Sequence, residues 1–148
     1  GATPARRRRG AGIAVRHGCG LGARGMTKGG RMAGYLTTHV LDTARGRPAA
    51  GMGVTLYRLG AAGRTEVARA TTNADGRTDA PILPCESFAP GAYELVFAVG
   101  AWLDAQGEPG GAPRFLDDVP IRFGMSEASH YHVPLLVSPY GYSTYRGS

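Results

Sequence analysis

The sequence predicts a mostly β protein, built as a two-sheet antiparallel β-sandwich with one short helix. Three observations support this fold class. From residue 33 onward, apolar and polar residues alternate with a period of two, as they do in half-buried strands. Gly, Pro, Asn and Asp cut these runs into seven or eight short strands. At most a turn or two of helix fits between them, and this combination is typical of a sandwich.

The first half of the patterned region predicts three strands. Residues 34–42 form the first, and residues 52–59 and 64–72 form the next two. Each run ends where glycine and other turn residues begin. The turn after the third strand closes at Gly76, which can adopt the positive φ that a branched residue could not.

The second half predicts four further strands and the short helix. A strand at residues 92–100 carries alternating large apolar side chains, and a helix fits within residues 101–106, before the next glycine and proline. Residues 118–125 alternate again. Residues 130–148 then predict two strands that turn at Ser138–Gly141.

Positive charge is concentrated near the start of the chain. The formal net charge is +6, yet residues 1–31 hold eight Lys and Arg and no acidic residue, so the remainder is slightly acidic. The same segment holds nine Gly and no apolar periodicity, so we expect a disordered, basic Gly/Arg-rich extension. Residues 32–148 are expected to form a single domain. The extension has three open interpretations: residues upstream of a start at Met26 or Met32, an arm that binds nucleic acid, or an inert tail.

Neither a membrane span nor an export signal is evident in the sequence. No stretch reaches the roughly 18–20 apolar residues that cross a bilayer, so we expect no membrane partner. Arg16, His17 and Arg24 interrupt every apolar stretch near the start, which argues against a secretory signal and favours the cytoplasm. Cys19 and Cys85 lie in the extension and in a loop, and we expect free thiols.

Histidines gather on strand faces that point away from the expected core. If Leu36 points inward, strand alternation directs His39 outward, and the same rule directs His130 and His132 outward. An outer face that mixes histidine with apolar groups fits a subunit interface or a ligand groove. A single strand histidine is nevertheless more often a surface residue than a catalyst, and Arg77 is by default a solvated residue. Three imidazoles could bind a metal, but no acidic or Cys ligand pattern accompanies them.

Three segments carry a resemblance to a known family. Residues 35–59, residues 72–79 and, above all, the terminal residues 130–148 (HYHVPLLVSPYGYSTYRGS) resemble the 5-hydroxyisourate hydrolases, the transthyretin-related enzymes of urate degradation. The resemblance covers roughly residues 33–148 and none of the basic extension. The closing YRGS is its most specific piece, because it distinguishes the hydrolases from transthyretin, the hormone carrier of the same fold.

The resemblance implies a site and an assembly. By position, the family's catalytic residues fall on His39, Arg77 and His132, and its substrate-lining residues fall on the last four positions, Tyr145, Arg146, Gly147 and Ser148. His130 receives no direct role. The family sandwich forms a homotetramer, a dimer of dimers with active sites in a channel between dimers. Members of the family also occur in peroxisomes and the periplasm. No metal, nucleotide or flavin motif is evident in this sequence, so we expect an enzyme without a cofactor.

The implied reaction is hydrolysis of the N1–C6 amide bond of 5-hydroxyisourate, which gives 2-oxo-4-hydroxy-4-carboxy-5-ureidoimidazoline. Histidine suits water activation and proton return, because its pKa lies near neutrality, and a guanidinium suits the oxyanion. Which histidine acts as the base is left open. The main alternative is a transthyretin-like carrier that binds a small ligand without turning it over. A nucleic-acid partner finds no support in residues 32–148, where no basic aromatic surface is evident.

Overall fold

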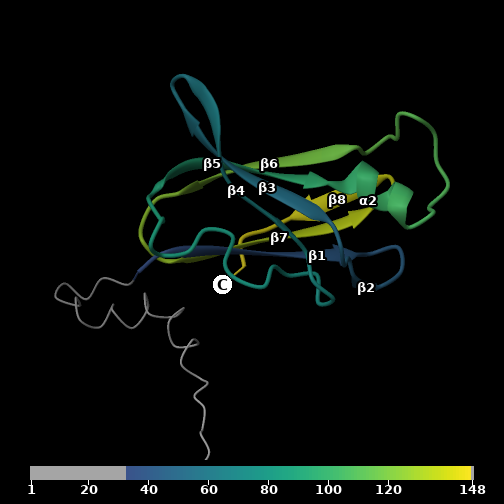
Figure 1. The fold of residues 1–148 in the computed structure, drawn as a ribbon, viewed down its shortest axis with the longest axis horizontal. Helices are drawn as coiled ribbons and strands as arrows, with labels where there is room; N and C mark the ends of the chain where they lie inside the picture. Colours follow the sequence, from purple (N-terminus) through teal and green to yellow (C-terminus); the bar gives the residue numbers. More distant parts are fainter. Residues whose placement is uncertain (1–32, 148) are drawn as a thin grey trace, which may run out of the picture. The chain divides into compact units, whose positions relative to one another are not determined.

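A computed structural model of the chain describes residues 33–147, and the predicted extension at residues 1–31 lies outside them. Within that range the chain forms the strands and the helix labelled in Figure 1. Their bounds are β1 Tyr35–Asp42, β2 Arg47–Pro48, β3 Gly53–Gly60, β4 Gly63–Thr71, β5 Gly91–Ala98, α2 Val99–Ala105, β6 Asp118–Met125, β7 His130–Ser138 and β8 Gly141–Thr144.

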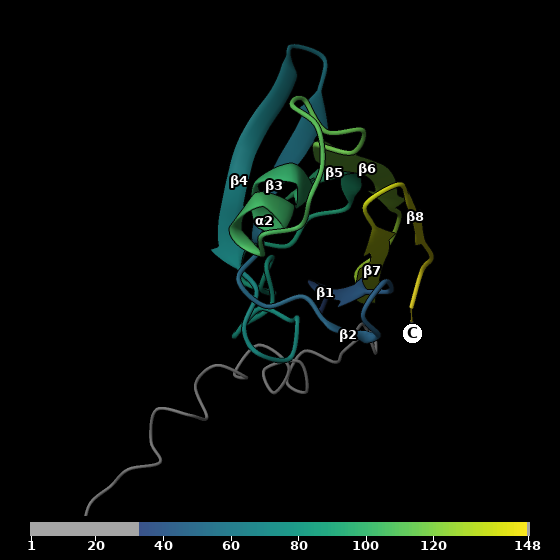
Figure 2. The same cartoon turned by 90° about the vertical axis from the view of Figure 1, so that its right-hand side faces the viewer.

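The strands form two four-stranded sheets, with the orders β2-β1-β7-β8 and β4-β3-β5-β6. Figure 2 shows β1, β7 and β8 as one layer and β3 to β6 as the other. The predicted two-sheet sandwich with one short helix is therefore confirmed. One pairing departs from a purely antiparallel arrangement, because β1 and β7 run parallel. Parallel neighbours cannot be joined by a short hairpin and need a long connection. Here the strands of the whole second sheet lie between β1 and β7 in the sequence and provide that connection.

The core lies between the sheets and confirms the predicted alternation. On β1 the side chains alternate between buried and half-buried, and Leu36 and Val40 are fully buried. On β5, Tyr93, Leu95 and Phe97 all face the core. Because side chains alternate along a strand, these buried positions direct their neighbours to the outer faces.

The helix begins two residues earlier than predicted. It covers Val99–Ala105 and buries Trp102 and Leu103. The Trp102 indole N–H donates to the backbone oxygen of Ala50 over 2.7 Å, which anchors the helix to the loop before β3. The sequence pattern placed Val99 in the preceding strand, because it continues the alternation of buried residues there. Val99 is indeed buried, but as the first residue of the helix.

A long loop after β4 lies along the edge of β1 that faces away from β7. Backbone bridges join Leu36 to Leu83 and His39 to Arg77. In Figure 1 this teal segment passes beside β1. The loop thereby brings the Asn73–Arg77 turn next to the middle of β1, although about 35 residues separate them in the sequence.

The same loop contains Cys85, which is disulfide-bonded in the structure, so the expected free thiol is wrong for this residue. Cys19 lies outside the described residues. Among residues 33–147, no helix has the length and apolarity needed to cross a membrane.

Candidate active site

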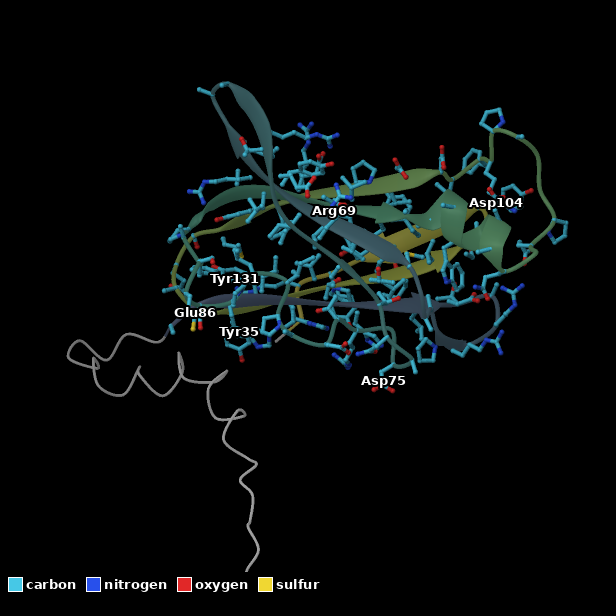
Figure 3. The ribbon with its side chains drawn as sticks, viewed as in Figure 1. Tyr35, Arg69, Asp75, Glu86, Asp104 and Tyr131 are labelled. Carbon is cyan, nitrogen blue, oxygen red and sulfur yellow. The ribbon has the colours of Figure 1, made fainter. Side chains whose placement is uncertain are left out.

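His39 and His132 lie on neighbouring strands of one sheet, on the face directed away from the core. Both side chains are half-buried, and their ring centroids are 6.5 Å apart with a 33° angle between the planes. Figure 3 shows this face of β1, with Tyr35 and Asp75 beyond the strand and Tyr131 between the sheets. The structure therefore brings together two histidines that are 93 positions apart in the sequence.

The Asn73–Arg77 turn sets Arg77 beside His39. The Val40 N–H donates to the Gly76 oxygen over 2.8 Å, and Gly76 has a φ of +77°. A Cβ at Gly76 would lie 2.4 Å from the backbone oxygen of Val40, so glycine allows this close approach. The guanidinium of Arg77 is exposed and forms no ion pair with any residue between 33 and 147. Its positive charge is available to an electron-rich ligand.

The chain after β8 continues beside β7 and reaches His132. The Gly147 N–H donates to the His132 backbone oxygen over 2.7 Å. A Cβ on Gly147 would lie 2.6 Å from the His132 ring carbon Cδ2. Gly147 thus lies against the imidazole of His132, and its lack of a side chain makes that contact possible. Ser148 lies outside the described residues.

The other two predicted substrate-lining residues occupy different surroundings. Tyr145 is 59% exposed. The Arg146 guanidinium lies 4.1 Å from the centroid of the Tyr131 ring, and one of its nitrogens is 3.5 Å from the Ser129 hydroxyl. Within this chain the Arg146 guanidinium therefore packs on the Tyr131 ring, and its charge also acts on His130.

The environment lowers the pKa of each histidine in this region. For His39 the main cause is burial and the second is the charge of Arg77, while a hydrogen bond to the Asp75 backbone and the Asp75 carboxylate act the other way. For His132 the causes are burial, then Arg77, then His130 and His39. Burial and Arg146 lower the pKa of His130. Lowered pKa values keep these imidazoles neutral near pH 7, the form that can accept a proton.

One residue at the site was missed by sequence reasoning. Thr37 lies between two histidines, with its hydroxyl oxygen 2.8 Å from His130 Nε2 and 2.8 Å from His132 Nδ1. Its register partner on β7 is His132. Strand alternation places Thr37 on the same face as His39, but only the parallel pairing of β1 with β7 identifies its neighbours.

A metal centre is not assembled from the described residues: no group of three His, Cys, Asp or Glu side chains between residues 33 and 147 is arranged to hold a metal ion. What the face does assemble is two neutral imidazoles, an unpaired guanidinium and a backbone segment at Gly147. This set can activate a water molecule, return a proton and stabilise developing negative charge.

Comparison with known proteins gives consistent matches. The HIUase/Transthyretin family profile matches residues 36–147. A 5-hydroxyisourate hydrolase of Mesorhizobium japonicum is 64% identical over 115 residues, which are 78% of this chain and 93% of the relative.

Solved structures share the fold. Klebsiella pneumoniae 5-hydroxyisourate hydrolase matches with a TM-score of 0.65 and 37% identity over 78% of this chain and 99% of its own. Sea bream transthyretin, solved in complex with thyroxine, matches with a TM-score of 0.68 and 26% identity over 76% of this chain and 93% of its own. An (S)-allantoin synthase matches with a TM-score of 0.73 and 44% identity over 78% of this chain, which spans only 44% of that longer protein. On this evidence, the chain belongs to the HIUase/transthyretin family.

Proposed function

We propose that this protein is a 5-hydroxyisourate hydrolase, which opens the six-membered ring of its substrate by hydrolysis of the N1–C6 amide bond. The observation that carries the proposal is the pair of neutral imidazoles, His39 and His132, beside the guanidinium of Arg77, which forms no ion pair with residues 33–147. The names of the relatives, Mesorhizobium japonicum 5-hydroxyisourate hydrolase among them, support the same substrate.

In the proposed mechanism, His39 and His132 share the movement of one proton. One imidazole takes a proton from water, and the hydroxide attacks the C6 carbonyl carbon. Arg77 holds the planar substrate and stabilises the tetrahedral oxyanion through its N–H donors. The N1–C6 bond then breaks, and an imidazolium returns the proton to the leaving nitrogen. The water supplies every atom that is added, and the proposed steps use only side chains of the protein, with no metal or other cofactor.

The end of the chain completes the proposed site. The Gly147 backbone lies against the His132 ring, and Ser148 is proposed to orient water or substrate with its hydroxyl. Tyr145 and Arg146 are proposed to line the substrate. Since Arg146 contacts Tyr131 within this chain, that role requires its guanidinium to leave the Tyr131 ring.

We also propose a homotetramer, formed as a dimer of dimers, of domains spanning residues 32–148. Within the described residues, β8 is an edge strand, and the exposed side chains Tyr140 and Tyr142 lie in or beside it. An unpaired strand edge and exposed aromatic rings favour association with a second copy. The proposed location is the cytoplasm, and no nucleic-acid or membrane partner is proposed.

The second candidate function is a carrier of small aromatic ligands, favoured by the structural match to sea bream transthyretin in complex with thyroxine. The two functions differ in the chemistry they require: a carrier needs no proton-transfer groups, whereas a hydrolase needs His39, Arg77 and His132.

The first test generates fresh 5-hydroxyisourate with urate oxidase and follows its ultraviolet decay with and without the protein. Decay faster than the spontaneous rate supports the hydrolase, and an unchanged rate with saturable ligand binding supports the carrier.

A further inference from the structure

The hydroxyl of Thr37 joins two imidazoles on the outer face of the β1–β7 pair. It lies 2.8 Å from His130 Nε2 and 2.8 Å from His132 Nδ1, both within hydrogen-bond distance. The parallel register holds this arrangement, because Thr37 is directly opposite His132 and Tyr35 is opposite His130. The side chains on one face of neighbouring strands are therefore fixed next to one another.

Hydrogen-bond accounting restricts the protons in this chain of groups. A hydroxyl has one hydrogen to donate and can accept others, whereas a neutral imidazole has one N–H and one bare nitrogen. If Thr37 accepted from both histidines, its own hydrogen would find no acceptor among residues 33–147. The arrangement that uses this hydrogen within residues 33–147 has Thr37 donate to one histidine and accept from the other. The protonation of His130 and that of His132 are coupled through a single oxygen.

Two arrangements satisfy this accounting. In the first, His132 donates from Nδ1 to Thr37, and Thr37 donates to His130 Nε2, which leaves Nε2 of His132 bare and able to act as a base. In the second, His130 donates from Nε2 to Thr37, and Thr37 donates to His132 Nδ1, so that Nε2 of His132 carries a hydrogen and can act as an acid. When His132 takes up a proton at Nε2, a proton shift through Thr37 to His130 Nε2 converts the first arrangement to the second, with His130 then an imidazolium and with no rotation of either ring.

We propose that Thr37 is a positioning residue that sets the tautomer of His132 and, together with His130, forms a proton relay that lets His132 act first as base and then as acid. The proposal rests on the proposed hydrolase function and refines it, since it assigns to His132 the two roles that the mechanism above leaves shared with His39.

The protons balance through one turnover. When water attacks, its O–H bond breaks and an Nε2–H bond forms on His132. The Nδ1 proton of His132 moves to Thr37, and the hydroxyl proton of Thr37 moves to Nε2 of His130, which becomes an imidazolium. His132 then gives its Nε2 proton to the leaving nitrogen. The relay runs back from His130, and all three groups return to their first state.

The surroundings of His130 suit a transient positive charge. The Tyr35 ring is stacked on the His130 ring, with centroids 4.2 Å apart and an interplanar angle of 7°. An aromatic face stabilises a cation above it. Burial, the larger cause, and the charge of Arg146 act the other way and lower the pKa of His130. The opposing effects keep His130 neutral at rest and make it a proton acceptor that returns its proton readily.

The test compares Thr37→Val, which keeps the shape but removes the hydroxyl, with Thr37→Ser, which keeps the hydroxyl. We expect Thr37→Val to lower kcat about 10- to 100-fold with KM changed by less than about twofold, and Thr37→Ser to retain activity within about threefold. His130→Gln, which can bond to Thr37 but cannot take up a proton, should lower kcat as Thr37→Val does. Thr65→Val on the exposed strand β4 is the matched control and should leave kcat unchanged.

A second measurement needs no turnover and separates this proposal from the proposed function. Nitrogen-15 NMR of the labelled free protein distinguishes Nδ1–H from Nε2–H imidazoles. We expect His132 to be the Nδ1–H tautomer at neutral pH in the wild type and to lose that preference in Thr37→Val. An Nε2–H tautomer in the resting wild type, or equal activity in Thr37→Val and the wild type, overturns the relay. A wild type that fails to accelerate the decay of 5-hydroxyisourate overturns the proposed function, while the NMR result still decides the tautomer.

Discussion

Gly147 lies directly against His132, with its N–H bonded to the His132 oxygen over 2.7 Å and its α-carbon facing the imidazole. The contact ties the end of the chain to the proposed catalytic histidine. A side chain at position 147 would lie where the His132 ring now lies, so the position of the ring depends on this glycine.

Replacement of Gly147 by alanine is expected to displace His132. The new Cβ would lie 2.6 Å from the ring carbon Cδ2, closer than any van der Waals contact, so the ring or the tail must move. Since a displacement of about 1 Å can reduce catalysis by about 100-fold, kcat/KM should fall by about that factor. Steady-state kinetics measures the fall, and thermal unfolding checks that the domain stays folded. Gly60→Ala, where the nearest atom is 3.9 Å away, is the control and should keep wild-type activity.

Replacement of Arg77 by glutamine is expected to shift the pH dependence of the reaction. The charge of Arg77 lowers the pKa of His39 and of His132, second only to burial in each case. Loss of that charge raises both pKa values, so the neutral base is lost at a higher pH, and the acid side of the kcat/KM profile moves upward. The overall rate should also fall, because the oxyanion loses its positively charged donor.

The control for this experiment is Arg69→Gln, on the opposite sheet, as Figure 3 shows. Arg69 pairs with Glu66 and causes no shift in either histidine. Its pH profile should match that of the wild type. An unshifted profile in Arg77→Gln would mean that the guanidinium does not act on the histidines.

Replacement of Gly76 by alanine is expected to cost stability and activity together. The change adds a Cβ at a φ of +77° and places it 2.4 Å from the Val40 oxygen. Strain at positive φ alone costs about 1 kcal/mol, and the clash should bring the total loss of unfolding free energy to about 2–3 kcal/mol. Urea unfolding measures it. Gly51→Ala isolates the φ contribution, because Gly51 has a φ of +85° and no atom within 4 Å of the added Cβ.

Much of the fold and part of the site could be predicted from alternation alone. The buried positions on β1 and β7 direct His39 and His132 outward, because a strand has a strict period of two. The turn before Arg77 was predictable for a similar reason, since a glycine at a positive φ has a recognisable sequence signature. Both inferences use only neighbours within a few residues.

The rest depends on contacts between distant segments. Nothing local specifies that β1 pairs in parallel with β7, so the position of Thr37 between His130 and His132 was not predicted. The bridge from His39 to Arg77 likewise requires the long loop to return along β1. Sequence separation hides such pairings, because many strand orders satisfy the same alternation. The resemblance to a family supplied the candidate residues of the proposed site but not these contacts.

Removal of metal ions is expected to leave activity unchanged. Within residues 33–147 no three suitable side chains converge on a metal position, and one nitrogen each of His130 and His132 already bonds to Thr37. Hydrolysis by imidazole and guanidinium requires no Lewis acid. Dialysis against a chelator, followed by the ultraviolet decay assay, measures this. Loss of activity that zinc restores would contradict the cofactor-free mechanism.

Glu94 is expected to make stability depend on pH at the acid end. Its side chain is buried, on the outer face of β5, and its two oxygens accept from Arg64 over 2.6 Å and from Arg122 over 3.0 Å. Burial is the largest single influence and raises its pKa, but the two guanidinium groups together lower the pKa below its ordinary value. A carboxylate with a lowered pKa in the folded state stabilises that state above the ordinary pKa. This contribution is lost as the pH falls through the folded-state pKa.

Glu94→Gln should therefore reduce the free energy of unfolding near pH 7 by about 1–2 kcal/mol, because both guanidinium groups lose a charged acceptor. The difference from the wild type should shrink as the pH falls below about 4, where the wild-type carboxylate is itself increasingly protonated. Urea unfolding across this pH range measures it. The matched control is Glu66→Gln, which removes an exposed carboxylate bonded to Arg69 and should change stability little at any pH. A Glu94→Gln deficit that stayed constant from neutral to acid pH would mean that the side chain contributes through packing and not through its charge.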